Sequence, residues 1–292
     1  MKLKKIYEEK YKKLLLIPIL LLIFALIQIA LQYATTGDFV NRGITLKGGA
    51  TITIEGETGM TPQEIQRFLT DKFPISDISV RTLSSAGSAI GEIIELDTQE
   101  RSEIDSVIAV LKDRLDLSND SYSIEIVGSA LGKGFFIQSL IALLIAFGLM
   151  GIVVFLYFRR AVTSLTIILA AASDIIVTLA IFNLTGIKLS SAGVAAFLML
   201  IGYSVDSDIL LSTRVIKRND GPVTERVYGA MKTGLTMSAT TLAAVLISMV
   251  FIQNDTIKQI MVILFIGLLV DLIMTYIQNV GILRWELEHK QK

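Results

Sequence analysis

Six long runs of apolar residues divide this chain of 292 residues. An α-helix rises about 1.5 Å per residue, so about 20 apolar residues cross the roughly 30 Å hydrocarbon core of a bilayer. The runs that meet this length are approximately 14–34, 135–158, 161–184, 190–212, 234–252 and 260–283. The first run follows several lysines, but it is longer than the about 7 to 15 apolar residues of a secretory signal and is interpreted as a retained anchor. The pattern predicts a polytopic α-helical membrane protein with six transmembrane helices.

The segment between the first two runs has a different pattern, in which apolar and polar residues alternate over short distances. Apolar residues predict strand on both sides of a bulge or bend at Gly48 and Gly49, at positions Ile44, Leu46, Ile52 and Ile54. Further strands are predicted at 78–83, 90–96 and 122–127. Residues 35–134 are therefore expected to fold as a soluble domain inserted between the first two spans.

Two helices are predicted between these strands. Thr61, Pro62 and Glu64 form a capping-box start with proline at the first helical position, followed by a buried stripe of Ile65, Phe68 and Leu69. The second helix places four apolar residues on one face, namely Ile104, Val107, Ile108 and Leu111. The order β-α-β-β-α-β predicts a ferredoxin-like α+β domain. Its acids fall at solvated positions and no G-x-x-x-x-G-K-[ST] motif is present, so no active site is predicted there.

Composition agrees with a membrane protein and limits its chemistry. Hydrophobic residues make up 52% of the chain, charged residues 18%, and the mean hydropathy is +0.64. The 27 basic and 27 acidic residues give no net charge, so nucleic acid is not an expected partner. Without cysteine, the chain has neither a thiol nucleophile nor a Cys-based metal site. No catalytic residues, metal or cofactor are predicted, and the chain is not expected to be an enzyme.

The distribution of basic residues predicts the orientation in the cell membrane. Sixteen Lys and Arg residues fall at the termini and in the short loops of one side, whereas the short loops of the other side contain only Lys188 and Lys258. Cytoplasmic loops are enriched in Lys and Arg, so both termini are expected in the cytoplasm. The predicted organisation is a cytoplasmic N-terminus (1–13), a first transmembrane helix (14–34), an external domain (35–134), a five-helix membrane core (135–284) and a cytoplasmic tail (285–292).

Four acidic residues lie inside the predicted spans, namely Asp174, Asp206, Asp208 and Asp271. An aspartate at the centre of a membrane helix costs about 2.5–3.5 kcal/mol, and no Lys or Arg accompanies these acids at mid-depth. Such residues mark ion pathways, so the four are candidates for an ion or proton pathway. Asp206 and Asp208 lie about 200° apart around their helix, so one is expected to face the interior and the other a partner or water. Gly202 shares the face of Asp206 and would let another helix approach closely.

The fifth run begins with several hydroxyl residues, which are Thr233, Thr236, Ser238, Thr240 and Thr241. These side chains either join helices through hydrogen bonds or belong to the same pathway, to which Thr233, Thr240 and Thr241 are assigned as candidates. The preceding loop has a turn signal at 219–222, and then apolar residues at helical spacing. This pattern predicts a short amphipathic helix at the cytoplasmic interface, with Val223, Val227 and Met231 on one face.

Five short motifs carry a resemblance to a known family. Residues 43–49 read Gly-Ile-Thr-Leu-Lys-Gly-Gly and residues 127–133 read Val-Gly-Ser-Ala-Leu-Gly-Lys, with glycines at Gly43, Gly48, Gly49, Gly128 and Gly132. The third, fourth and fifth spans contain Asp174 followed by Thr178, then Gly202-Tyr203-Ser204, then Thr240-Thr241-Leu242. In their order and spacing these motifs resemble the SecF family, where they read G-[IV]-D-F-x-G-G, V-G-P-x-x-G-K, H-D-x-x-x-T, G-Y-S and T-T-L. The resemblance extends over almost the whole chain.

This resemblance implies the smaller subunit of a SecD/SecF protein-export complex, built as one six-helix half of a transporter related to the RND superfamily. The external domain would engage an emerging polypeptide, while proton or cation movement past the intramembrane acids, driven by the proton-motive force, would bias its motion. A SecD-like membrane subunit and the Sec translocation channel are the implied partners. In bacterial members the transport carboxylate aligns with Ser207 and an arginine aligns with Thr233, beside Lys232 here. These differences resemble the archaeal branch of the family.

Two other functions are compatible with six spans and intramembrane acids. One is a stand-alone RND-like exporter of small apolar molecules. The other is an intramembrane aspartyl protease that uses two of the acids. Such a protease is expected to carry a G-x-G-D element, whereas Gly202 is followed here by Tyr-Ser-Val-Asp.

Overall fold

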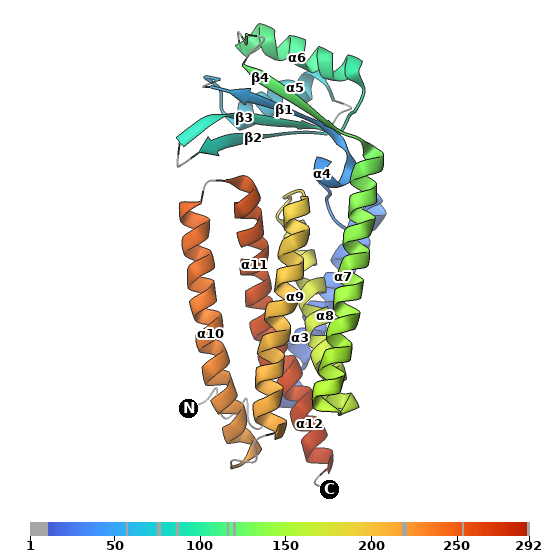
Figure 1. Cartoon of the computed structure of the whole chain (residues 1–292), viewed down its shortest axis with the longest axis vertical. Helices are drawn as coiled ribbons and strands as arrows, with labels where there is room; N and C mark the ends of the chain where they lie inside the picture. Colours follow the sequence, from blue (N-terminus) through green and yellow to red (C-terminus); the bar gives the residue numbers. More distant parts are fainter. Residues whose placement is uncertain are drawn as a thin grey trace.

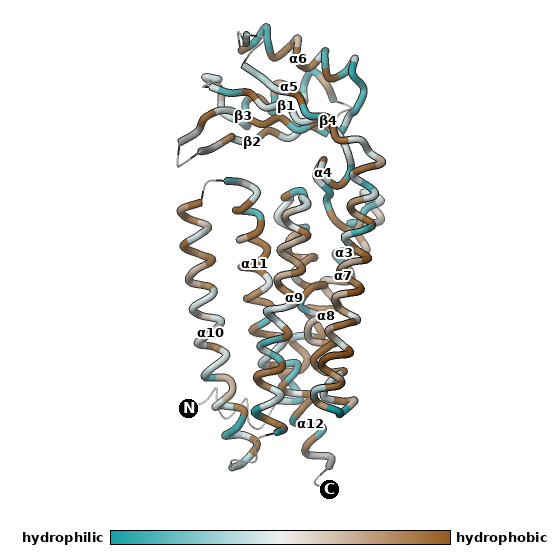
Figure 2. The backbone as a smooth tube through the Cα atoms, in the orientation of Figure 1, coloured by the Kyte–Doolittle hydropathy of each residue, from teal (hydrophilic) through white to brown (hydrophobic). Residues whose placement is uncertain are grey.

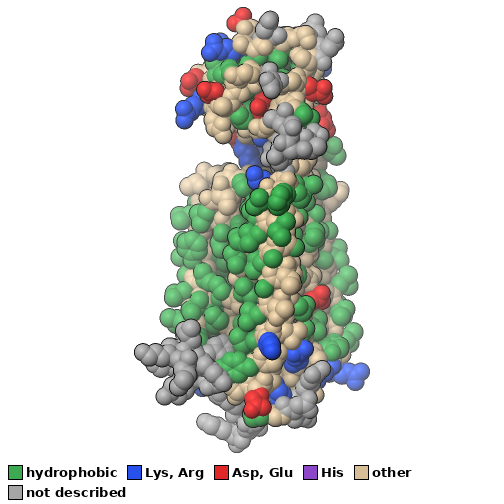
Figure 3. Space-filling view, turned by 90° about the vertical axis from the view of Figure 1, so that its left-hand side faces the viewer, with side chains coloured by type: hydrophobic (Ala, Val, Ile, Leu, Met, Phe, Trp, Pro, Cys, Tyr) green, Lys and Arg blue, Asp and Glu red, His purple; other side chains and the backbone are tan. Residues whose placement is uncertain are grey.

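The computed structural model describes residues 11–56, 58–74, 77–85, 88–115, 117–118, 121–217, 221–252 and 254–290. Six helices of this part are long and apolar enough to cross a membrane, which confirms the predicted spans. They are α3 (Leu16–Thr36, after the short α2, Tyr11–Leu14), α7 (Ser129–Phe158), α8 (Ala161–Leu184), α9 (Ser191–Ser212), α10 (Val223–Phe251) and α11 (Asp255–Ile273). Figure 3 shows hydrophobic side chains covering the middle of this bundle.

The interior of the bundle is formed by α8, α9 and α11, while α3, α7 and α10 lie at its periphery (Figure 1). Helix α11 continues through a π-helical segment (Met274–Asn279) into α12 (Val280–Lys290). Hydrophilic positions within the bundle are concentrated toward the end remote from the sheet (Figure 2). At that end Arg284 stacks on the ring of Tyr11 at 4.5 Å, so the first described residues lie beside the last helix. Which side of the membrane this end faces stays a prediction.

The fifth span begins earlier than predicted. Helix α10 starts after Pro222, which is its N-cap residue, and runs without a break to Phe251. The prediction of a separate amphipathic helix is therefore wrong. No proline follows Pro222 before the apolar run, and Val227 and Ala230 are buried against the end of α9 and the π-helical segment of α11, so the helix continues from the interface into the bundle. The first two residues of the predicted turn, 219 and 220, lie outside the described residues.

The external domain is a four-stranded sheet with two helices on one face (Figure 1). Its elements are β1 (Gly49–Glu55), α5 (Pro62–Lys72), β2 (Ile78–Ser85), β3 (Ser88–Leu96), α6 (Arg101–Leu115) and β4 (Tyr122–Val127). The sheet order is β2-β3-β1-β4, with antiparallel neighbours throughout. This is the predicted order β-α-β-β-α-β, and the core contains the predicted apolar stripes of both helices, including Ile65, Leu69, Ile104, Val107 and Leu111. The opposite face of the sheet is turned toward the membrane bundle (Figure 1).

The start of α5 has the predicted capping box. The side chain of Thr61 accepts a hydrogen bond from the backbone N–H of Glu64, and the Glu64 carboxylate accepts one from the backbone N–H of Thr61 at 2.8 Å. This second hydrogen bond stabilises the carboxylate and lowers the pKa of Glu64.

The strand predicted at Ile44 and Leu46 is wrong. Residues Ile44–Lys47 form one helical turn, α4, and the strand begins only at Gly49. Gly48 and Gly49 have φ values of +91° and +147°, which side-chain-bearing residues rarely adopt, so the two glycines permit the change from helical turn to strand. A Cβ on Gly132 of α7 would lie 2.6 Å from the backbone N of Gly48. The glycine motifs before and after the external domain thus pack against each other, backbone to backbone.

Gly43 and Gly128, two further glycines of these motifs, each lie at the start of a helix. Gly43 precedes α4 as its N-cap residue and donates its backbone N–H to the carbonyl of Leu189, at 2.8 Å. Gly128 is the N-cap residue of α7, directly after β4. The backbone N–H of Leu189 in turn donates to the carbonyl of Asn41 at 2.6 Å, so the loop between α8 and α9 is joined to the chain entering the domain.

Candidate functional site

Three of the four intramembrane acids meet in the interior of the bundle. Asp174 on α8, Asp208 on α9 and Asp271 on α11 each have no exposed surface. Asp271 lies thirteen residues after Lys258 and thirteen before Arg284, the basic residues at the two ends of its apolar run. It is therefore about 20 Å along the helix from either end, near the middle of the span.

A single hydroxyl joins two of these acids. The Oγ1 of Thr275 lies 3.0 Å from a carboxyl oxygen of Asp208 and 3.0 Å from one of Asp271. Asn279 donates its amide Nδ2 to the same oxygen of Asp208 at 2.6 Å. Thr275 and Asn279 lie in the π-helical segment after α11, and such segments are frequent at functional sites because they turn side chains away from the regular helical register.

The hydroxyls of α9 join the other side of the cluster. Ser204 donates to a carboxyl oxygen of Asp174. The Oγ of Ser207 lies 3.2 Å from Asp271 Oδ2 and donates to the carbonyl of Tyr203, one turn earlier, at 3.0 Å.

The hydroxyl of Thr275 has one proton and two carboxyl neighbours. It makes a full hydrogen bond to both Asp208 and Asp271 when one of these carboxyls is protonated and donates to the hydroxyl oxygen. The hydroxyl of Ser207 likewise has two acceptors within reach, the carbonyl of Tyr203 and Asp271 Oδ2. Among the described residues no Lys, Arg or His forms an ion pair with the three acids. The arrangement is therefore a buried group of three carboxyls, in which the hydroxyl of Thr275 links Asp208 to Asp271 and the hydroxyl of Ser204 contacts Asp174.

Some oxygens of the cluster remain without a hydrogen-bond partner among the described residues. They are Asp174 Oδ1, Asp208 Oδ2 and Asn279 Oδ1, all fully buried. Burying an unpaired polar atom is costly, so the site keeps unused acceptors at a place where the helices otherwise pack closely. The described residues contain no group of His, Cys, Asp and Glu side chains that could hold a metal ion.

Asp206 lies outside this cluster. Its side chain is exposed on α9, so Asp208 is the member of the pair that faces the interior. Gly202, one turn earlier, is also exposed, and a Cβ there would meet no atom of the described chain within 4 Å. Beside them Tyr203 reaches α10, where its hydroxyl lies 3.2 Å from that of Ser238.

The candidate threonines of α10 are also apart from the acids. Thr233 accepts a hydrogen bond from Arg214 at 2.8 Å, near the end of the bundle remote from the sheet. The hydroxyls of Thr240 and Thr241 donate to the carbonyl of Met237 on their own helix, at 2.8 and 3.0 Å. The structure thus brings together Asp174, Asp208 and Asp271, but not the threonines.

Sequence reasoning did not single out Thr275 and Asn279 as site residues. The spacing in the sequence could have identified them. Polar residues recur at intervals of four, at Asp271, Thr275 and Asn279, and so share one face of a helix. Gln278, which donates to Ser173 of α8 at 3.2 Å, adds a further polar contact between the same helices.

Comparisons with known proteins all match this chain to protein-export membrane proteins. A family model described as protein export membrane protein SecD/SecF, C-terminal, matches residues 107–289. The protein-export membrane protein SecF of Pyrococcus furiosus is 39% identical over 284 residues, which cover 97% of this chain and 93% of the relative. SecF of Methanocaldococcus jannaschii is 38% identical over 295 residues, which cover 97% and 99%.

Solved structures share the fold. SecDF, a translocon-associated membrane protein from Thermus thermophilus, aligns with a TM-score of 0.71 at 20% identity, over 97% of this chain and 39% of that one. SecDF in a super-membrane-facing form aligns with a TM-score of 0.64 at 21% identity, over 94% and 38%. The chain therefore spans well under half of each SecDF chain.

Proposed function

The chain belongs to the SecF family of protein-export membrane proteins, and we propose that it couples proton movement through the Asp174, Asp208 and Asp271 cluster to the export of polypeptides. A role in protein export follows from the family. In our proposal the chain is an auxiliary subunit of the Sec translocase, both termini are cytoplasmic, and the external domain engages the emerging polypeptide. The proposal assigns no catalytic chemistry to the chain.

One observation carries the proton pathway: Thr275 bridges two buried carboxyls with one hydroxyl proton. When one of the two carboxyls is protonated, moving that proton to the other needs only a reversal of hydrogen bonds through the threonine. Asp271 lies near the middle of its span, about 20 Å along the helix from either end. Intramembrane acids without basic partners are typical of proton relays.

The exposed face of α9 supports a SecD-like partner. Leaving Asp206 against lipid would cost about 2.5–3.5 kcal/mol, so a polar surface is expected to cover it. Gly202 beside it leaves space for the backbone of another helix, and Met199, one turn earlier, is 57% exposed. A homologous six-helix half, which would supply part of the remaining length of a SecDF chain, is the proposed cover.

The test of the proton pathway uses the complex of the chain with its SecD-like subunit, reconstituted into vesicles that enclose a pH-sensitive dye. Thr275→Val keeps the shape of the side chain but removes the shared hydroxyl. Losing a hydrogen bond to a charged group costs about 1.5–3 kcal/mol, which corresponds to about a 10- to 100-fold slower proton flux. Thr275→Ser keeps the hydroxyl and is the matched control, expected near the wild-type rate.

Asp208→Asn is expected to reduce both flux and export while the complex still assembles. Asp206→Asn is expected to act instead on assembly, lowering recovery of the SecD-like subunit in mild detergent. Proton flux at the wild-type rate in the assembled Thr275→Val complex would contradict the proposed relay. Ion flux that follows a Na⁺ gradient at constant pH would show that the coupling ion is Na⁺ and not the proton.

A further inference from the structure

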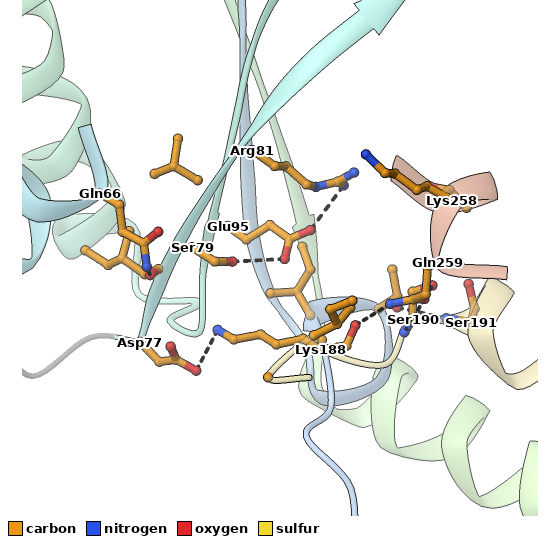
Figure 4. Close-up of a pocket in the computed structure, with 18 of the residues that line it drawn as sticks. Gln66, Asp77, Ser79, Arg81, Glu95, Lys188, Ser190, Ser191, Lys258 and Gln259 are labelled. Atoms are coloured by element: carbon orange, nitrogen blue, oxygen red, sulfur yellow. Dashed lines mark hydrogen bonds and ion pairs between the residues drawn. The ribbon is translucent and has the colours of Figure 1, made fainter. Parts of the chain in front are cut away.

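A cavity separates the external domain from the membrane bundle. It has a volume of about 600 Å³ and lies between the uncovered face of the sheet, the loop joining α8 to α9, and the start of α11 (Figure 4). Basic side chains are visible at the waist between the domain and the bundle (Figure 3). The charged residues that line the cavity are Asp77, Arg81, Glu95, Lys188 and Lys258.

Both acids of the cavity are already paired. Lys188, from the loop between α8 and α9, forms an ion pair with Asp77 at 2.7 Å. Glu95 of β3 is paired with Arg81 of β2 at 3.2 Å and also accepts from a neighbouring serine of β2. These pairs account for two of the three cations, so one positive charge has no counterion among the described side chains that line the cavity.

That charge is on Lys258. Its ammonium group forms no hydrogen bond or ion pair within the part of the chain that the structure describes. Figure 4 shows it extended across the mouth of the cavity toward the guanidinium group of Arg81. Glu95 already compensates the charge of Arg81, whereas Lys258 has no anion beside it among the described residues, so a further anion at this place would compensate Lys258 and could also contact the guanidinium. A tetrahedral phosphate suits such a pair, since it offers several acceptor oxygens to a guanidinium and an ammonium at once.

The position of Lys258 indicates where the phosphate would come from. Lys258 lies in the first turn of α11, beside Ile257, which is 40% exposed. The last residues of α10, Val250 and Phe251, are 76% and 78% exposed. These apolar side chains belong to the surface that meets lipid tails, so Lys258 sits at the level of the headgroups. A soluble phosphate or an acidic polypeptide would gain nothing from this apolar border.

We propose that Arg81 and Lys258 bind the phosphate of a lipid headgroup from the leaflet on the side of the external domain. Because Arg81 belongs to the sheet and Lys258 to the bundle, one lipid joins the domain to the membrane surface. The lipid would act with the ion pair of Lys188 and Asp77 to hold the sheet above the helices. This site does not depend on the proton pathway.

The test measures retained lipid by native mass spectrometry of the full chain, purified in detergent with phosphatidylglycerol. Lys258→Gln is expected to lower the occupancy of bound lipid about tenfold, the effect of losing a charge-assisted hydrogen bond. Lys133→Gln is the matched control, because Lys133 is exposed near the start of α7, away from the cavity, and should leave occupancy unchanged. Lys258→Arg should retain the lipid.

Two further arms distinguish the sources of the anion. The first supplies inorganic phosphate alone, and the second supplies a soluble acidic peptide. Equal lipid retention by wild type and Lys258→Gln would overturn the site, as would equal losses in Lys258→Gln and Lys133→Gln. Binding of inorganic phosphate or peptide at Lys258 without any preference for lipid would overturn the assignment to a headgroup.

Discussion

Replacing Gly132 by alanine tests the contact that seats the external domain on the bundle. The new Cβ would lie 2.6 Å from the backbone N of Gly48 and 3.0 Å from the carbonyl carbon of Lys47. Both neighbours are backbone atoms, so they cannot rotate away as a side chain would. Overpacking of this kind costs typically about 1–3 kcal/mol, whereas alanine in a helix gains about 1 kcal/mol over glycine.

The matched control is Gly134→Ala, two residues later on the same helix. A Cβ at Gly134 would meet no described atom within 4 Å, so this variant has only the gain in helix propensity. The difference between the two variants cancels that gain and isolates the overpacking, which we expect near 2–3 kcal/mol because backbone must move.

The assay is hydrogen exchange of the full chain in detergent, followed at the amides of α4. The backbone N–H of Gly48 donates to the carbonyl of Ile44 at 2.7 Å and should be protected in the wild type. In Gly132→Ala its exchange is expected to rise by one to two orders of magnitude, as about 1.4 kcal/mol corresponds to tenfold. Equal protection in Gly132→Ala and Gly134→Ala would refute the reasoning.

Two further predictions concern local packing. Thr61→Ala removes the cap of α5 and should cost about 1 kcal/mol, read from faster exchange of the first turn. Because the pKa of Glu64 is lowered in the folded chain, its contribution is present above the unfolded pKa and is lost as pH falls through the folded value. The protection factors of the wild-type amides in this turn, corrected for the intrinsic exchange rate at each pH, should therefore fall in acid. Equal protection factors at neutral and acid pH would contradict this. Gly234→Ala places a Cβ 2.0 Å from the hydroxyl of Tyr276, a buried residue of the π-helical segment after α11, and should lower the thermal midpoint by separating α10 from this segment. Gly229→Ala, with nothing within 4 Å, should not lower it, and equal midpoints would contradict the contact.

The spans and the order of elements in the external domain could be predicted because they depend on local pattern. Helix α8 begins and ends at the predicted residues, Ala161 and Leu184, where a continuous apolar run stops. The capping box at Thr61 needs only residues three apart.

The helical turn at α4 could not be predicted from local pattern. Ile44 and Leu46 alternate with polar residues as in a strand, but both are buried, and Gly48 beyond them packs against Gly132, more than eighty residues later in the chain. Tertiary contact overrides a two-residue alternation of this kind.

The members of the acid cluster were predictable only in part. The sequence identified Asp206 and Asp208 as lying on different faces of α9, but which one is buried depends on the placement of α8 and α11. The bridging hydroxyl of Thr275 depends on a π-helical segment, which alters the regular spacing of side chains.

The pairing of β1 with β4 has a consequence for biosynthesis. Gly49 lies opposite Val127, so the strand that opens the external domain is completed by the strand that closes it, and Gly128 then leads at once into α7. In the proposed orientation, β1 keeps one edge unpaired during synthesis until residue 127 has crossed the membrane. The same stretch of chain is then the next to enter the bilayer. We expect closure of the sheet and insertion of the second span to occur as one event, so a delay in either should expose an open strand edge to quality-control proteases.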